Sequence, residues 1–154
     1  MATVGIGVKG LRTTQRKLKE LPDDAKGELV KASGRIAKVV GDQAAMRFTA
    51  LGNQGPLVGR TLRSTKGTVP TIKVGGSSKL GRNKAPAYKL LYGTEFGSDK
   101  YKQFHAAHTG RVGRALYPTV RDRAEYMYSQ WKDAADKVAR DFAEGGDGAE
   151  EAIV

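Results

Sequence analysis

Two histidines, His105 and His108, are the side chains of this sequence best suited to acid–base or metal chemistry. Their three-residue spacing would place both imidazoles on one side of a helix, where they could share a metal ion. Zinc needs a third and usually a fourth ligand, and the chain contains no cysteine. The nearest carboxylates, Glu95 and Asp99, follow no metal-binding spacing. We therefore expect neither a metal site nor another cofactor.

Patterns for covalent catalysis or nucleotide binding are also missing from the sequence. A serine nucleophile is typically held in a Gly-x-Ser-x-Gly turn near a histidine, and no such turn occurs. The glycines Gly5, Gly7 and Gly10 have the spacing of a dinucleotide-binding loop, but only four residues precede them. That is too few for the strand that presents such a loop. The sequence predicts that the protein is not an enzyme.

Charge is the strongest compositional signal, with a net charge of +11 over 154 residues. Residues 60–123 hold 14 basic and 3 acidic side chains, whereas residues 124–154 hold 3 basic and 8 acidic ones. Such clustering attracts polyanions or acidic protein surfaces, while solubility alone requires no clustering. The basic residues expected to face a partner or DNA are Arg60, Arg63, Lys66, Lys73, Lys79, Arg82, Lys84, Arg111 and Arg114.

The stretch from Ala85 to Phe104, APAYKLLYGTEFGSDKYKQF, places five aromatic residues among lysines. Such a mixture can neutralise phosphates while its rings stack on bases, yet no established nucleic-acid-binding motif is present. We expect its first half, 87–92, to pack in the body of the protein and its second half, 93–104, to reach a neighbouring subunit. The candidate interface residues are Tyr92, Phe96, Tyr101 and Phe104.

Apolar periodicity predicts helices towards both ends of the chain. Leu11, Leu18 and Leu21 would share one face of a helix over 11–21. Apolar residues recur every three or four positions over 25–48 and from Leu116 for about 28 residues. Met127 and Trp131 are expected to anchor the last helix in the core. Three glycines recur every seven residues in the second helix, which is compatible with a groove for close packing or with a flexible helix: Gly27, Gly34 and Gly41.

The middle of the chain predicts short strands and loops. Segments 60–65 and 68–76 are strand-like and flank a Lys66–Gly67 turn, so they should form a hairpin. The preceding residues 50–59 read as a turn, and the basic glycine-rich residues 75–86 read as a mobile loop. The aromatic segment that follows is either a third strand or a short helix ended by Gly93.

These elements predict an α+β fold, with a small, mostly antiparallel sheet flanked by N-terminal helices and one long C-terminal helix. One domain should cover residues 1–143, and residues 144–154 should form an acidic disordered tail. No stretch approaches the roughly 18 apolar residues that a membrane span requires, so no membrane contact is expected.

Five segments, taken in order, resemble the neck-region tail-completion (head–tail connector) proteins of long-tailed bacteriophages. The order and spacing of the segments, rather than any single motif, make the resemblance, which covers about residues 8–140. The segments are Val8–Leu21 (VKGLRTTQRKLKEL), Val58–Thr65 (VGRTLRST), Thr71–Gly76 (TIKVGG), Pro86–Ser98 (PAYKLLYGTEFGS) and Gly113–Asp122 (GRALYPTVRD).

The resemblance implies a structural protein of the virion neck, present in the host cytoplasm before assembly. It implies a homo-oligomeric ring, commonly six-fold, that completes the tail and joins it to the head. The implied partners are the head connector or stopper, the tail tube or terminator proteins, and genomic DNA in non-specific contact with the lumen. No catalytic residue is carried over. The alternative, suggested by charge alone, is a small basic nucleic-acid-binding protein.

Overall fold

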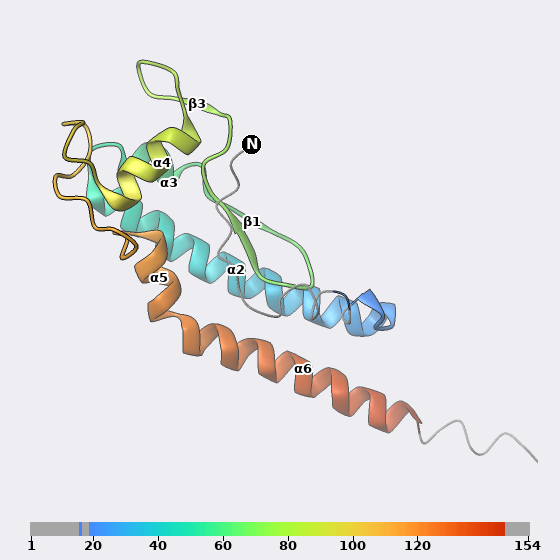
Figure 1. Ribbon diagram of the computed structural model, residues 1–154. Helices are drawn as coiled ribbons and strands as arrows, with labels where there is room; N and C mark the ends of the chain where they lie inside the picture. Colours follow the sequence, from blue (N-terminus) through green and yellow to red (C-terminus); the bar gives the residue numbers. More distant parts are fainter. Residues whose placement is uncertain (1–15, 17–18, 147–154) are drawn as a thin grey trace, which may run out of the picture.

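The computed structural model describes Arg16 and residues 19–146. The fold is α+β and mostly helical, as predicted, with one long helix towards each end and short antiparallel strands between them (Figure 1). The helices are α2 (Asp23–Leu51), α3 (Gly55–Gly59), α4 (Ala87–Phe96), α5 (Leu116–Asp122) and α6 (Ala124–Gly146). The strands are β1 (Arg63–Thr65), β2 (Thr71–Lys73), β3 (Lys79–Leu80) and β4 (Ala85–Pro86).

Helix α2 is the central element: α3, α5, α6 and the strands β1 and β2 pack along it, whereas α4 packs on α3 and on β4 (Figure 1). Its predicted apolar stripe is confirmed, because one side of the helix is buried from Ala25 to Phe48. Two acidic residues, Asp23 and Asp24, occupy its first turn, where carboxylates favour the positive end of the helix dipole. No described residue packs closely on Gly27 or Gly34, since a Cβ there would have no described atom within 4 Å.

Close packing through glycine occurs instead in α3, within the segment predicted to be a turn. A Cβ on Gly55 would overlap the backbone carbonyl of Phe48, and a Cβ on Gly59 would lie 3.1 Å from the carbonyl oxygen of Ala45. Glycine therefore allows this short helix to lie directly on the α2 backbone. The central apolar cluster then joins α2, α3, α4 and the start of α5: Ala44, Phe48, Val58, Leu90, Leu91, Ala115 and Leu116.

The strands form two separate hairpins. The predicted hairpin is confirmed in β1 and β2, which pair antiparallel with Ser64 opposite Ile72. The second hairpin, β3 with β4, lies in the segment predicted to be a mobile loop, so that prediction is wrong. Its two backbone bonds to the start of α4, Ala87 N–H to Ser78 O and Tyr88 N–H to Gly76 O, hold the segment in place. The aromatic segment after it is a helix that continues past Gly93 to Phe96.

The C-terminal apolar stripe is divided between two helices rather than one continuous helix. Arg123 ends α5, and its guanidinium Nε donates to Gln43 Oε1 on α2 at 2.6 Å, so the chain turns at this contact. Helix α6 then runs back along α2 (Figure 1). Met127 and Trp131 are only half-buried, which corrects their prediction as core anchors. Helix α6 continues to Gly146, so residues 144–146 of the predicted tail are helical.

Candidate interaction surface

Glu95, in the last turn of α4, is the most deeply buried ionisable side chain in the described structure, with 1% of its surface exposed. Its carboxylate accepts hydrogen bonds from the backbone N–H groups of Ala115, Leu116 and Tyr117, at 3.2, 2.9 and 2.9 Å. These are N–H groups at the start of α5, which otherwise have no partner within that helix. Glu95 thus caps α5 and ties it to α4.

The glycines around Glu95 permit the close approaches that this cap requires. A Cβ on Gly93 would overlap the ring of Phe104, and a Cβ on Gly113 would overlap the Glu95 carboxylate. Gly97 ends α4 with φ +79°, and a Cβ there would lie 2.7 Å from the carbonyl oxygen of Ala107. The glycines of segment 93–97 therefore allow the chain that follows α4 to fold back and pack against this helix.

The eighteen residues from Gly97 to Arg114, called here the pinned loop, have no regular secondary structure, yet polar contacts fix their path. Arg114 donates from its guanidinium to the carbonyl oxygens of Ala106 and Ala107, at 2.9 and 2.8 Å. Asp99 accepts from the N–H of Ala107 at 2.8 Å. The side chain of Arg114, predicted to face a partner, thus lies against its own loop.

Both histidines belong to the pinned loop, and they are not on a helix as the metal hypothesis required. His105 Nε2 lies 2.6 Å from the carbonyl oxygen of Leu51, and since a carbonyl can only accept, Nε2 carries the hydrogen. His108 Nδ1 accepts from the N–H of Gly110 at 3.1 Å. Within residues 19–146, no three potential ligand side chains lie together in a way that could hold a metal ion.

The four predicted interface aromatics divide into two exposed and two packed rings. Tyr92 is 43% exposed and Tyr101 is 54% exposed. Phe96 is half-buried beside Tyr117, with ring centroids 5.4 Å apart, and Phe104 packs against the central apolar cluster of its own chain. Sequence reasoning missed Val112, which is 60% exposed on the pinned loop. The only sequence feature that could have indicated its exposure is its position between two Gly-Arg pairs, in GRVGR.

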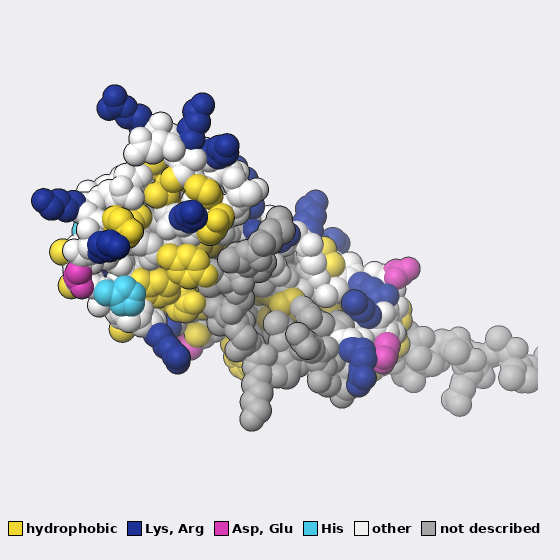
Figure 2. Space-filling model, turned by 45° about the horizontal axis from the view of Figure 1, so that its top comes forward, with side chains coloured by type: hydrophobic (Ala, Val, Ile, Leu, Met, Phe, Trp, Pro, Cys, Tyr) yellow, Lys and Arg dark blue, Asp and Glu magenta, His cyan; other side chains and the backbone are white. Residues whose placement is uncertain are grey.

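The other eight predicted basic residues are exposed and spread over several elements. Arg63 and Lys73 face each other across β1 and β2, an arrangement of like charges that lowers the stability of a hairpin. Three more lie on or beside the β3–β4 hairpin: Lys79, Arg82 and Lys84. Figure 2 shows Lys and Arg side chains projecting around an area of hydrophobic side chains on this face of the molecule.

The carboxylates of this segment are all used within the chain. Glu95 caps α5, Asp99 holds the pinned loop, and Asp122 pairs with Arg47 on α2. As a result, none of the 14 basic side chains between Arg60 and Arg123 makes an ion pair with another described residue. The sequence showed the charge excess, and the structure shows that nothing in the described chain neutralises it.

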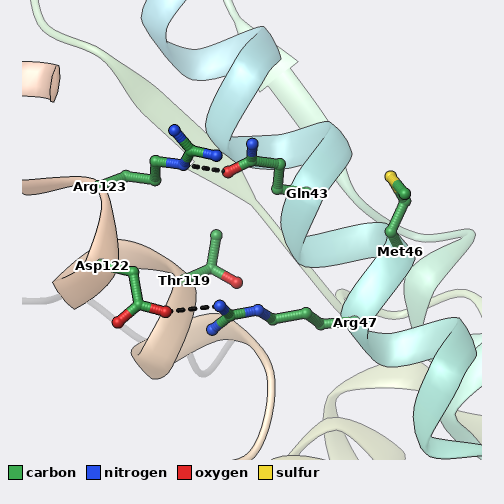
Figure 3. Close-up of a pocket in the computed structure, with 6 residues that line it drawn as sticks. All are labelled: Gln43, Met46, Arg47, Thr119, Asp122 and Arg123. Carbon is green, nitrogen blue, oxygen red and sulfur yellow. Dashed lines mark hydrogen bonds and ion pairs between the residues drawn. The ribbon is translucent and has the colours of Figure 1, made fainter.

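An open cleft with a volume of about 450 Å³ lies between α2 and α5 (Figure 3). Its two arginines are already engaged, because Arg47 pairs with Asp122 and Arg123 binds Gln43. Thr119, which also lines it, donates its hydroxyl to the carbonyl oxygen of Ala115 at 2.7 Å. These contacts lie between α2 and the end of α5 and hold the two helices together.

Comparisons with known protein families, with curated proteins and with solved structures find no match for this chain. The resemblance to phage neck proteins therefore stays a prediction from the sequence. No helix within the described part of the chain is both long enough and apolar enough to cross a membrane.

Proposed function

We propose that this protein is a structural component of a phage neck, which forms a ring, completes the tail and joins it to the head connector. The observation that supports an assembly role is the pinned loop with its exposed apolar side chains. Tyr92, Tyr101 and Val112 are exposed on α4 and this loop, although water does not favour their apolar surface. The backbone of the loop is held by internal contacts, since Arg114 and Asp99 bond to it and Glu95 fixes the start of α5 that follows it.

A fixed backbone suits such a surface to protein recognition. A loop that is already ordered loses little conformational entropy when it binds, so more of the contact energy appears as affinity. Aromatic side chains are the commonest anchors of protein interfaces. The unpaired cations around them favour a partner with an acidic surface and speed its approach. The partner in this proposal is another copy of the chain or a neighbouring ring of the neck.

The decisive experiment removes the exposed anchors and measures assembly. We expect the wild-type chain to form rings, visible by native mass spectrometry, and to be present in purified virions. The triple variant Tyr92→Ser, Tyr101→Ser, Val112→Ser should lose both properties while remaining folded. Met46→Ser with Tyr128→Ser is the matched control, because each of these residues is 71% exposed on another surface. A wild-type chain that is monomeric with its tail partners and absent from virions would contradict the proposal.

The unpaired cations support a second candidate, a small basic nucleic-acid-binding protein. Such a protein would bind long DNA or RNA as a free chain, with an affinity that falls steeply as salt rises. It would be absent from purified virions and would not depend on the exposed apolar anchors. The virion measurement therefore separates the two candidates.

A further inference from the structure

The β3–β4 hairpin and its flanks, residues 76–85, form a segment that we call the cationic arm. It projects from the body beside α4 (Figure 1). Only Leu80 and Ala85 pack inward, against the central apolar cluster. The other side chains are all exposed and all polar or absent: Gly76, Ser77, Ser78, Lys79, Gly81, Arg82, Asn83 and Lys84.

The base of the cationic arm is firmly attached, so its tip is presented in a defined place. Its backbone bonds to the start of α4 close the base, and the N–H of Gly75 donates to Thr61 Oγ1 at 2.9 Å. At the tip, the N–H of Lys84 donates to the carbonyl oxygen of Gly81 at 3.2 Å. Gly81 and Lys84 both have positive φ, +68° and +49°, which makes the turn tight.

The tip carries three positive charges and no carboxylate. Lys79, Arg82 and Lys84 make no ion pair with any residue that the structure describes. The carboxylate closest in sequence, Glu95, is buried and occupied by α5. An anionic partner would therefore meet three cations that no carboxylate of the described chain neutralises.

The chemistry of the tip distinguishes between an acidic protein and a nucleic acid. A protein interface needs apolar or aromatic anchors in its centre, and the cationic arm exposes none. Binding to single-stranded nucleic acid relies on aromatic rings that stack on bases, and these are also missing from the arm. Lysine, arginine, serine and asparagine side chains with exposed glycine backbone are the donors that contact phosphate oxygens in duplexes.

We propose that the cationic arm binds the phosphate backbone of duplex DNA without reading its sequence. The inference rests on the proposed neck function for the biological source of that DNA, whereas the binding chemistry stands on the arm itself. The arm would act separately from the apolar anchors of the pinned loop, which serve protein contacts.

The test is binding of the full-length protein to a fluorescently labelled duplex of arbitrary sequence, followed by anisotropy. Loss of three phosphate contacts in Lys79→Gln, Arg82→Gln, Lys84→Gln should make the slope of log affinity against log salt shallower by about 2.7. Between about 50 and 200 mM salt, the wild-type affinity should therefore fall about 40-fold more than that of the variant. The same oligonucleotide as a single strand should bind more weakly than the duplex.

The matched control removes three cations of α2 that already have carboxylate partners: Lys26→Gln, Lys31→Gln and Lys38→Gln. Its net charge equals that of the arm variant, yet it should retain most of the wild-type slope. The inference would be overturned if the arm variant had the same salt-dependence slope as the wild type. It would also be overturned if the arm variant and the α2 control variant lost equal amounts of slope. A chain that binds duplex DNA through the arm but is absent from virions would refute the neck function and leave this inference standing.

Discussion

The pinned loop and the cationic arm are both basic, glycine-rich connections, and they differ in how they are held and in what they expose. The loop is fixed largely by side chains, because Arg114 and Asp99 bond to its backbone and the buried Glu95 carboxylate holds the start of α5 directly after it. Backbone bonds such as that from Thr109 N–H to Phe96 O add to these contacts. The arm is fixed mainly by backbone bonds at its base and by the packing of Leu80 and Ala85, and its three cations form no ion pair with a described residue. The loop exposes apolar groups such as Tyr101, whereas the arm exposes polar ones only. Positive charge alone therefore does not define the kind of partner. In our proposals, exposed apolar side chains beside the charge favour a protein, and their absence favours the phosphates of a nucleic acid.

The largest expected effect is loss of the loop's internal support in Glu95→Ala. Three backbone N–H groups at the start of α5 would lose a charged acceptor inside the protein, where water does not readily replace it. We expect the free energy of unfolding, measured with urea, to fall by about 3 kcal/mol.

Two comparisons show whether this effect is specific to the loop. Asp133→Ala removes an exposed carboxylate of α6 and should change stability by less than about 0.5 kcal/mol. The glutamine variant of the three arm cations should be equally neutral. A loss of stability in the arm variant as large as that in Glu95→Ala would contradict the distinction between the two regions.

A smaller effect is expected for Gly93→Ala, which would force the ring of Phe104 away from α4. Overpacking of this kind costs about 2 kcal/mol. In a Phe104→Ala background the cost of Gly93→Ala should largely disappear, because the ring that it meets is gone. Thermal or urea unfolding of the two single variants and the double variant measures the coupling, and strictly additive losses would show that the two residues act independently.

The arm should respond to backbone geometry rather than to side-chain packing. Lys84 is a non-glycine residue at φ +49°, a conformation that costs about 1 kcal/mol for residues with a Cβ. Lys84→Gly should therefore be more stable than Lys84→Ala by about that amount, although both variants lose the same charge. Equal urea midpoints for the two variants would argue against a left-handed tip.

The smallest effect concerns Glu28, an exposed carboxylate that contrasts with buried Glu95. A hydrogen bond from Lys137, at 3.0 Å, and a second from Lys31 lower the pKa of Glu28 below its ordinary 4.5. Because the folded pKa is the lower one, this stabilisation is complete above pH 4.5 and is lost as the pH falls through the folded value. In Lys137→Ala, an NMR titration should show the pKa of Glu28 rising towards 4.5, and an unchanged pKa would refute the contact.

The sequence predicted those elements whose pattern of apolar or turn-forming residues lies within one continuous segment. The stripe from Ala25 to Phe48 predicted α2, and the turn at Lys66–Gly67 predicted the β1–β2 hairpin. The break at Arg123 was missed because it depends on a contact with Gln43, eighty residues away in the chain. The helix α3 was missed because glycine and proline read as a turn, whereas here glycine allows a short helix to lie on α2. The predicted helix over 11–21 lies mostly outside the described residues.

By itself, the sequence determined the apolar stripes of the helices and the excess of positive charge between Arg60 and Arg123. These are properties of composition and spacing, which do not require knowledge of distant neighbours. Only the tertiary structure decided how each charge is used. It buried Glu95 against α5, turned Arg114 onto its own loop and left Lys79, Arg82 and Lys84 without a described partner. The physical reason is that hydrogen bonds and ion pairs depend on distances set by packing between segments, which local sequence does not specify.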